Sequence, residues 1–284
     1  MAKRSPFDVT GPTVYQFSSG RSSAKLAHDF MAANNGKLPP DVIFAFENTG
    51  KEDELSLKFA NECDKRFGLG LIWLEYTEGA GFRQVTYETA SRDGKPFEAV
   101  IEQRGGVLPN PRSRYCSSEM KTRTLHRFLR KEVGWTEWDT CLGIRADEPK
   151  RLAKFRANPH PETKAETIVL PLAEMRVTAK DVGNFWRAQP FDLELPNMGG
   201  KTMHGNCDLC FLKPARQVAS LIQEKPERAV WWAKQEEKAK EMATAAGAYF
   251  RNDRPSYARM MEYAGQQSDM FDANEEAISC FCGD

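Results

Sequence analysis

Cysteine is the residue type of this sequence with the clearest capacity for chemistry. Cys207 and Cys210 are separated by two residues, a spacing that lets two thiolates reach one metal ion from a single turn. Cys116 stands alone, and Cys280 and Cys282 flank one phenylalanine near the end of the chain, all in polar or turn-like sequence. These thiols could bind a metal, or act as nucleophiles if nearby Arg or Lys residues lowered their pKa.

The remaining two of the seven cysteines, Cys63 and Cys141, lie in apolar sequence, where cysteine usually acts as a small core residue. The start, Met1-Ala2-Lys3-Arg4-Ser5-Pro6, has no apolar run behind it, so we expect no signal peptide. No stretch approaches the ~20 consecutive apolar residues of a membrane span. We therefore expect a cytoplasmic protein without a membrane partner, in which reduced cysteines favour metal binding or catalysis over disulfides.

A serine-rich loop is the second candidate for chemistry. It follows a short apolar run at residues 13–17, which predicts a strand, and precedes a helix-compatible stretch at residues 24–33. A helix N-terminus offers unsatisfied N–H groups and partial positive charge, so such a loop can hold phosphate, although a simple helix cap has the same composition. The loop itself contains no Gly-Lys-Ser/Thr sequence, so it is not a Walker loop. The loop residues are Ser18, Ser19, Gly20, Arg21, Ser22 and Ser23.

A basic region runs from Arg112 to Lys131 and includes a helix-like stretch from about residue 118. The chain has 40 Lys plus Arg and 40 Asp plus Glu, so any attraction for nucleic acid must come from a local patch of this kind. The pattern is typical of a solvated helix face or of a surface for phosphates or a nucleic-acid backbone. The closeness of Cys116 favours the second interpretation.

The elements that would position these residues alternate between strand and helix. Residues 41–46, 70–76 and 138–144 predict further strands, and apolar residues recurring every four positions over 55–67 predict a helix. This alternation indicates an α/β fold with a Rossmann-like, doubly wound, mainly parallel sheet. Beyond residue 175 the pattern is mainly helical, so we expect one domain over 1–175 and a smaller, mostly helical region over 176–284.

Several ordered blocks between residues 13 and 215 resemble the phosphoadenosine-phosphosulfate (PAPS) reductase-like branch of the adenine-nucleotide α-hydrolase superfamily, the PP-loop ATP pyrophosphatases. The resemblance implies that the serine-rich loop holds nucleotide phosphates, with Asn48, Thr49 and Gly50 beside it at the carboxyl ends of the strands. The blocks are residues 17–23, residues 44–52, Arg114-Tyr115-Cys116 with Lys121, Gly143-Ile144-Arg145-Ala146-Asp147-Glu148 with Arg151, and Asn206-Cys207-Asp208-Leu209-Cys210-Phe211.

The same resemblance brings Arg145, Glu148 and Arg151 to the nucleotide pocket, while an exposed ion-pair cluster is the alternative for these three residues. Activating members of the superfamily carry Ser-Gly-Gly-x-Asp-Ser in the loop, and Ser22 stands here in place of the aspartate. This departure puts assistance by Mg²⁺ in doubt and threatens nucleotide binding itself less.

The resemblance also implies a metal centre that the C-terminal region would complete. A 4Fe-4S cluster would use Cys116, Cys207 and Cys210, with Cys282 or Cys280 as the fourth ligand because Tyr115 replaces the first of two adjacent cysteines. Tetrahedral Zn²⁺ would use the same thiolates, and scattered unligated thiols are the third alternative. In a fourth arrangement three cysteines hold a cluster with one open iron, and a tail cysteine carries sulfur as a persulfide.

The function that we expect from these features is adenine-nucleotide-dependent sulfur transfer. ATP would adenylylate an acceptor, for which a nucleic acid bound at the basic region is a candidate. Sulfur from the cluster or from Cys280 or Cys282 would then displace AMP. Arg145 and Glu148 are the other candidate catalytic residues, and a sulfur donor or cysteine desulfurase is a candidate partner. The alternatives are a thiol-dependent sulfonucleotide reductase, whose Glu-Cys-Gly-Leu-His tail motif is absent here, and a non-catalytic nucleotide-binding module.

Overall fold

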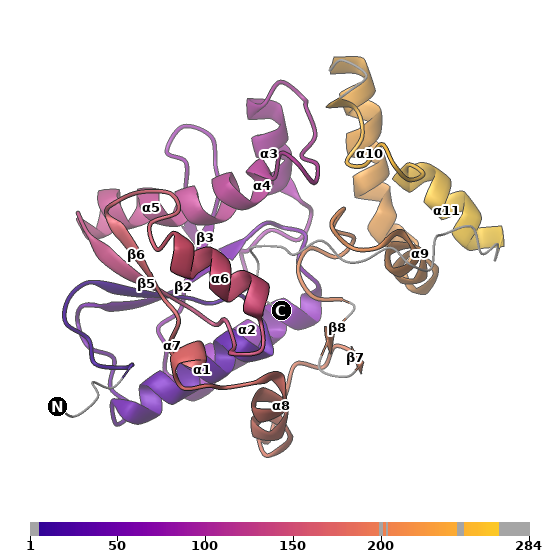
Figure 1. The fold of residues 1–284 in the computed structure, drawn as a ribbon. Coiled ribbons are helices and arrows are strands. Elements are labelled where there is room, and N and C mark those ends of the chain that lie inside the picture. The colour runs from indigo at the N-terminus through magenta and orange to yellow at the C-terminus, as the bar shows by residue number, and fades with distance from the viewer. Residues whose placement is uncertain (1–5, 199–200, 203, 243–246, 267–284) are drawn as a thin grey trace.

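The computed structural model describes residues 6–198, 201–202, 204–242 and 247–266 of the chain. Six strands form one sheet in the order β4-β3-β2-β1-β5-β6, and every pair in it is parallel except β3 with β4 (Figure 1). The chain thus builds the sheet outward from β1 in one direction and then in the other. This order confirms the expected Rossmann-like, doubly wound, mainly parallel sheet.

The expected strands and helices are present, with bounds within a few residues of those predicted. The strands are β1 (Thr13–Gln16), β2 (Val42–Asn48), β3 (Ile72–Glu75), β4 (Arg83–Val85), β5 (Trp138–Leu142), β6 (Glu166–Val169), β7 (Asn197–Met198) and β8 (Lys201–Thr202). The helices are α1 (Arg21–Ala33), α2 (Glu54–Phe67), α3 (Lys95–Gln103), α4 (Tyr115–Ser117), α5 (Thr124–Phe128), α6 (Pro149–Ala157), α7 (Pro171–Glu174), α8 (Ala179–Arg187), α9 (Ala215–Glu224), α10 (Glu227–Met242) and α11 (Tyr257–Gln266), with π-helical turns η1 (Ser118–Arg123) and η2 (Leu129–Val133).

The two faces of the sheet are covered by different helices because successive strand residues point to opposite sides. Tyr15 and Phe44 pack in a core with residues of α1, α2 and α8. Their strand neighbours Val14 and Ala45 pack in a second core with residues of α5 and η2. The central strands are therefore buried on both sides, and Figure 1 shows α1 and α2 on the face opposite α5.

Local signals fix where the helices begin and end. The Asp53 side chain accepts a hydrogen bond from Leu55 N at 3.0 Å at the start of α2, and Gly68, with φ 65°, ends that helix. Thr178 and Asp181 form a reciprocal capping box at the start of α8. The basic stretch forms one helical run from α4 through η2, interrupted by two π-helical turns.

The C-terminal region is mostly helical, as expected, and has a core of its own. Trp232 of α10 and Tyr257 of α11 are fully buried there with Phe97 of α3 and both cysteines of the Cys207–Cys210 turn. Helix α8 instead packs Trp186 into the core under α1, so residues beyond 175 contribute to the first core as well. The domain boundary at residue 175 stays a prediction.

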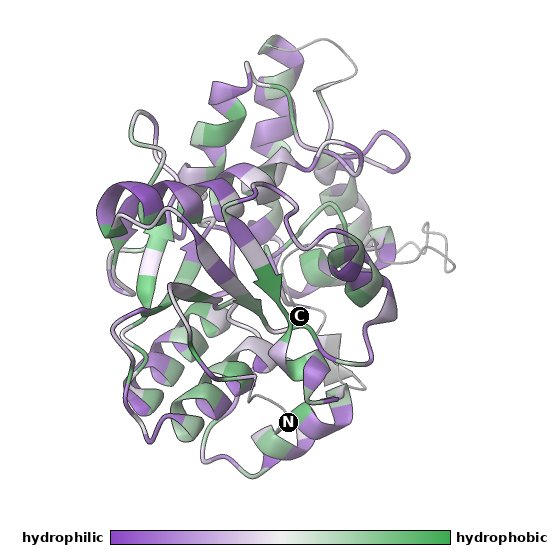
Figure 2. Ribbon diagram, turned by 60° about the vertical axis from the view of Figure 1, so that its left-hand side comes forward, coloured by the Kyte–Doolittle hydropathy of each residue, from purple (hydrophilic) through white to green (hydrophobic). Residues whose placement is uncertain are grey.

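Hydrophilic and hydrophobic residues alternate along the helices in Figure 2, as expected where one side of a helix is buried and the other exposed. In the described part of the chain, no helix combines the length and the apolar composition needed to cross a membrane.

Candidate functional site

The serine-rich loop lies where the strand order reverses. Strand β1 pairs with β2 on one side and with β5 on the other, and the loops after β1 and β5 leave from the same edge of the sheet. Gly143, directly after β5, is so close to α1 that a Cβ atom there would lie 2.9 Å from Ser23 Cα. Open α/β sheets bind ligands at such switch points, so the topology places this loop at the expected position for a ligand.

Hydrogen bonds within the loop hold its backbone in one shape. Ser23 Oγ accepts from Ser18 N at 3.2 Å and donates to Gly20 O at 3.0 Å. Ser19 adopts a positive φ of 56°, and its hydroxyl donates to Ser18 O at 2.6 Å. Gly20 is the N-cap of α1 and has extended backbone angles. The first turn of α1 therefore begins at the loop, as a phosphate site requires.

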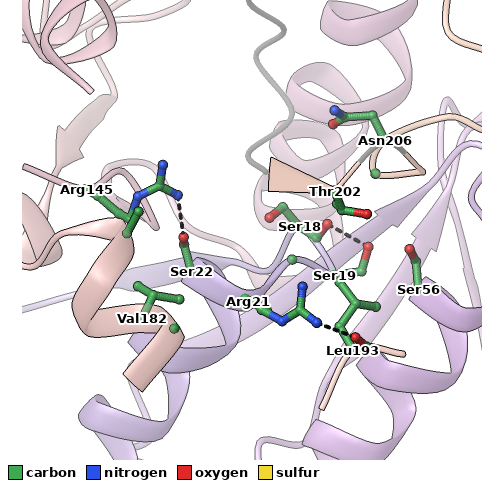
Figure 3. Close-up of a pocket in the computed structure, with 14 residues that line it drawn as sticks. Ser18, Ser19, Arg21, Ser22, Ser56, Arg145, Val182, Leu193, Thr202 and Asn206 are labelled. Atoms are coloured by element: carbon green, nitrogen blue, oxygen red, sulfur yellow. Dashed lines mark hydrogen bonds between the residues drawn. The ribbon is translucent and has the colours of Figure 1, made fainter. Parts of the chain in front are cut away.

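Arg145 extends from the loop after β5 to the start of α1. Its Nη1 donates to Ser22 Oγ at 2.8 Å, and its backbone N donates to Glu148 Oε1 at 2.9 Å (Figure 3). Arg151 Nη1 donates to the other oxygen of Glu148 at 2.5 Å. The structure thus brings Arg145, Glu148 and Arg151 together beside the serine-rich loop and links them in one ion-paired group. Their roles in catalysis and nucleotide binding stay predictions.

A pocket opens over the serine-rich loop and is lined by Ser18, Ser22, Arg145 and Asn206 among others. Figure 3 shows these side chains on the loop after β1, on α1, on the loop after β5 and on the segment before Cys207. Arg21 also lines the pocket, but its guanidinium donates to both carboxylate oxygens of Asp192, at 2.7 and 3.0 Å. Arg145 is ion-paired as well, since its Nε donates to Asp147 Oδ1 at 3.0 Å, while its Nη1 remains directed at Ser22.

Asn48, Thr49 and Gly50 lie on the side of the sheet edge that faces the cysteines. The Asn48 amide donates to Glu75 Oε1 at 2.6 Å and to Ser91 O at 2.8 Å, and its side chain is fully buried. Thr49 Oγ1 lies 3.4 Å from Cys207 Sγ. None of these three residues lines the pocket over the serine-rich loop. Their contact with a nucleotide stays a prediction.

Cys116, Cys207 and Cys210 line one pocket, together with apolar residues such as Phe211 and Met120. They come from two segments that are about ninety residues apart in the sequence. Asn206 lines both this pocket and the pocket over the serine-rich loop, so the two are neighbours. The fold therefore gathers the predicted ligand cysteines of the described chain at one place, next to the phosphate loop.

The turn that carries Cys207 and Cys210 is held by buried charges. The Lys213 ammonium donates to the carbonyls of Gly205, Cys207 and Asp208 at 2.8, 2.7 and 3.0 Å. The Asp208 carboxylate pairs with Lys51 Nζ at 3.1 Å and accepts from the indole of Trp232 at 2.8 Å. Charge-assisted hydrogen bonds are about twice as strong as neutral ones, so this turn is firmly fixed.

The donor set matches a thiolate-ligated metal in residue type but not in arrangement. Within the described residues, no group of three His, Cys, Asp or Glu side chains is arranged to hold a metal ion. Tyr115 stands beside Cys116, and burial, followed by the charge of Cys116, raises the pKa of its phenol, which donates to Val107 O. Tyr115 is thus a protonated neighbour, and Cys280 and Cys282 lie outside the described residues.

Cys63 and Cys141 are buried in the first core, as expected for core cysteines. Burial raises the pKa of both thiols, that of Cys141 to about 12. Both therefore remain protonated at neutral pH and are unsuited to attack an electrophile.

The charged side chains of the basic region contact different parts of the structure. Arg104, directly after α3, converges with Arg123 and Arg127 on the buried carboxylate of Glu119, at 2.7, 2.6 and 3.2 Å. His126 is buried, with Nε2 3.2 Å from Glu166 Oε1. The helical run is therefore partly a structural element, and only part of its charge lies toward the pockets.

Two positions of this site were missed by the sequence reasoning. Asn206, with a positive φ of 63°, connects the two pockets, and Lys213 anchors the cysteine turn. Asn206 stands directly before Cys207 in a block that resembles the superfamily, which was the available signal. A single lysine after the turn gave no signal.

No family model matches this chain. It is 28% identical over 216 residues to the uncharacterized nin region protein ORF290 of Escherichia phage lambda, covering 72% of this chain and 67% of that protein. It is also similar to the crystal structure of phosphoadenylyl-sulfate (PAPS) reductase from Candida auris in its phosphate complex, with 16% identity and a TM-score of 0.44 over 70% of this chain and 91% of that one.

Proposed function

We propose that this protein is an adenine-nucleotide-dependent sulfur-transfer enzyme of the PAPS reductase-like branch of the PP-loop superfamily. One observation carries the proposal: the pocket over the serine-rich loop and the pocket lined by Cys116, Cys207 and Cys210 share Asn206. An anion site built from a helix N-terminus and an arginine thus lies next to a set of thiols. Activation by a nucleotide and attack by sulfur need such neighbouring sites.

The serine-rich loop and Arg145 would hold the phosphates of ATP. An acceptor oxygen would attack the α-phosphorus, forming a P–O bond while the bond to pyrophosphate breaks. The N–H groups of α1 and the Arg145 guanidinium would stabilise the charge on the departing pyrophosphate. A sulfur nucleophile would then form a bond to the acceptor carbon, and the C–O bond to AMP would break.

Arg145 also bears on the missing loop aspartate. At the position where activating relatives carry an acid, Ser22 accepts a hydrogen bond from Arg145 at 2.8 Å. A fixed guanidinium at this point would supply positive charge to the phosphates. Binding of ATP would consequently depend less on Mg²⁺ than in proteins that carry the aspartate.

The thiols of Cys116, Cys207 and Cys210 would hold a 4Fe-4S cluster, with Cys280 or Cys282 as the fourth ligand and Zn²⁺ as the alternative metal. When bound, the cluster would supply sulfur or electrons to the reaction. The chain itself contributes a buried, largely apolar pocket and the Lys213-anchored turn that presents two of the thiols.

The testing experiment combines anaerobic purification with calorimetry. We expect iron and acid-labile sulfide in the purified protein, ATP binding in the presence of EDTA, and pyrophosphate release once an acceptor is present. Arg145→Gln should weaken ATP binding about tenfold, as expected for loss of a charged contact to phosphate, whereas the exposed Arg187→Gln should not. Sulfite release from PAPS with a thiol reductant would instead establish the reductase alternative, and tight binding without turnover a regulatory module.

A further inference from the structure

A groove adjoins the cysteine pocket, between the start of the basic region and helix α6. Its lining combines cations with hydroxyl groups. The cations are Arg112, Arg114 and Lys154, and the hydroxyls belong to Ser117, Ser118 and Thr122. Guanidinium, ammonium and hydroxyl groups are the side-chain donors that proteins use for phosphate oxygens.

The charge of this groove is positive. Among the described residues that line the groove, Glu162 is the acid. Its carboxylate lies 4.0 Å from Nε of Arg123, a residue that does not line the groove. The cations also crowd one another: burial lowers the pKa of Lys154, the nearby charges of Arg114 and Arg151 lower it further, and the charge of Glu162 opposes this shift without cancelling it. An anion placed among these groups would relieve their mutual repulsion.

The groove is continuous with both halves of the proposed site. It shares Arg114 and Ser117 with the cysteine pocket. It shares Ser117 and Thr122 with a third pocket, of about 530 Å³, which Ser18 of the serine-rich loop and Arg151 also line. A group bound in the groove would thus lie next to the thiols and on the path from the nucleotide loop.

We propose that this groove is a second phosphate-binding subsite, distinct from the serine-rich loop, which takes a phosphate group of the acceptor. The groove favours the phosphodiester backbone of a single-stranded nucleic acid as the source of this phosphate. The cations and hydroxyls of the groove adjoin both the cysteine pocket and the pocket lined by Ser18, so they could contact successive phosphates of one strand. Assignment of this phosphate to an acceptor rests on the proposed function. Lys154 of α6, outside the basic region identified from sequence, is the residue that defines the subsite.

The test uses the full chain and a short fluorescently labelled oligothymidylate, with binding followed by anisotropy at several salt concentrations. Lys154→Gln should weaken binding about tenfold at low salt and reduce the slope of log affinity against log salt by about 0.7, the share of one phosphate contact on a single strand. Arg156→Gln is the matched control, because Arg156 is an exposed cation of the same helix that does not line the groove. It should change the affinity by less than about twofold.

Two further arms identify the source of the phosphate. Binding of the oligothymidylate should persist with ATP at saturation, which supports a site distinct from the loop. If inorganic phosphate alone binds with the same dependence on Lys154, the subsite stands and its ligand is a free phosphate. Equal losses in Lys154→Gln and Arg156→Gln, or unchanged binding of both probes in Lys154→Gln, would overturn the subsite. If the wild type binds the oligothymidylate in the groove but does not bind ATP, the proposed function is refuted and the subsite is not.

Discussion

The serine-rich loop and the cysteine pocket are built on the same sheet edge by different means. The loop residues follow β1 and β5, two adjacent parallel strands whose register fixes the distance between Ser22 and Arg145. The cysteines come from the start of a helical run and from a turn far along the chain. One site is thus positioned by backbone pairing in the sheet, and the other by packing and buried charge.

The difference shows in how each region uses ionised groups. Around the loop, Arg145 and Arg151 share Glu148 at the pocket mouth and are only partly buried. Around the cysteines, Lys51, Asp208 and Lys213 are buried and bind backbone or one another. Removing one partner of a buried network leaves an uncompensated polar group, which costs more than losing a pair at the surface. The cysteine region should therefore be the more sensitive to substitution and to pH.

The largest effect should come from the cysteine turn. Cys207→Ser and Cys210→Ser should each abolish or strongly reduce the iron and sulfide content, because each removes a thiolate from the proposed set. Cys63→Ser is the control, since Cys63 is buried in the other core, away from this pocket. The measurement is iron and acid-labile sulfide after anaerobic purification. Equal iron in all three variants would show that the pocket holds no cluster.

A second prediction concerns pH and the packing of α10 on α11. Glu236 is buried and accepts a hydrogen bond from Tyr257 N at 2.9 Å, and burial raises the pKa of its carboxyl to about 7. Between its ordinary value of 4.5 and pH 7 the folded chain holds a proton that the unfolded chain releases. Its contribution to stability is therefore complete below pH 4.5 and is lost as the pH rises through 7, by up to about 3 kcal/mol.

Glu236→Gln should flatten this dependence, because the amide keeps an acceptor for Tyr257 N and cannot ionise. Urea unfolding between pH 5 and pH 8 measures the effect on the free energy of unfolding. Glu237→Gln, an exposed acid at the next position of α10, should leave the slope of the wild type unchanged. If the free energy of unfolding has the same pH slope in Glu236→Gln as in the wild type, Glu236 is not the source of the pH dependence of this region.

The third prediction tests backbone positioning at the phosphate loop. In Gly143→Ala the new Cβ would lie 2.9 Å from both Ser23 Cα and Ser23 N, so the loop after β5 must move away from α1. We expect a loss of about 1–3 kcal/mol in the free energy of unfolding, together with weaker ATP binding. Gly11→Ala, which meets no heavy atom within 4 Å, is the control. Equal stability and equal ATP affinity of the two variants would show that this close approach is unimportant.

The sequence was sufficient for part of the elements and for part of the site. Apolar runs made β1, β2, β3 and β5 predictable, and the four-residue spacing over 55–67 made α2 predictable, whereas α3, α6 and α11 were not predicted. The convergence of Arg145 on Ser22 could not be derived from local pattern, because it depends on β1 pairing with β5. That neighbourhood was expected only through resemblance to a family.

The basic region shows the limit of a charge count. Arg104, on another element, meets Arg123 and Arg127 at Glu119, and periodicity alone does not reveal such a tertiary contact. His126 turns into the core against Trp138, with ring centroids 5.0 Å apart, because the helix packs on the sheet by that face. Which cations of a basic helix remain available to a ligand is thus decided by packing against other elements.

The smallest effect is expected for two substitutions of Gly20 that differ in charge but have nearly the same shape. Gly20 is the N-cap of α1, and its extended backbone accommodates Asp or Asn, both of which cap helices well. Gly20→Asp and Gly20→Asn should therefore keep the melting temperature of the wild type or raise it slightly. Asp adds a negative charge where phosphates would bind, so ATP should bind about tenfold more weakly to Gly20→Asp than to Gly20→Asn, about 1.4 kcal/mol by calorimetry. Salt should narrow the gap by screening the repulsion, and equal ATP affinities at low salt would place the nucleotide phosphates away from this helix.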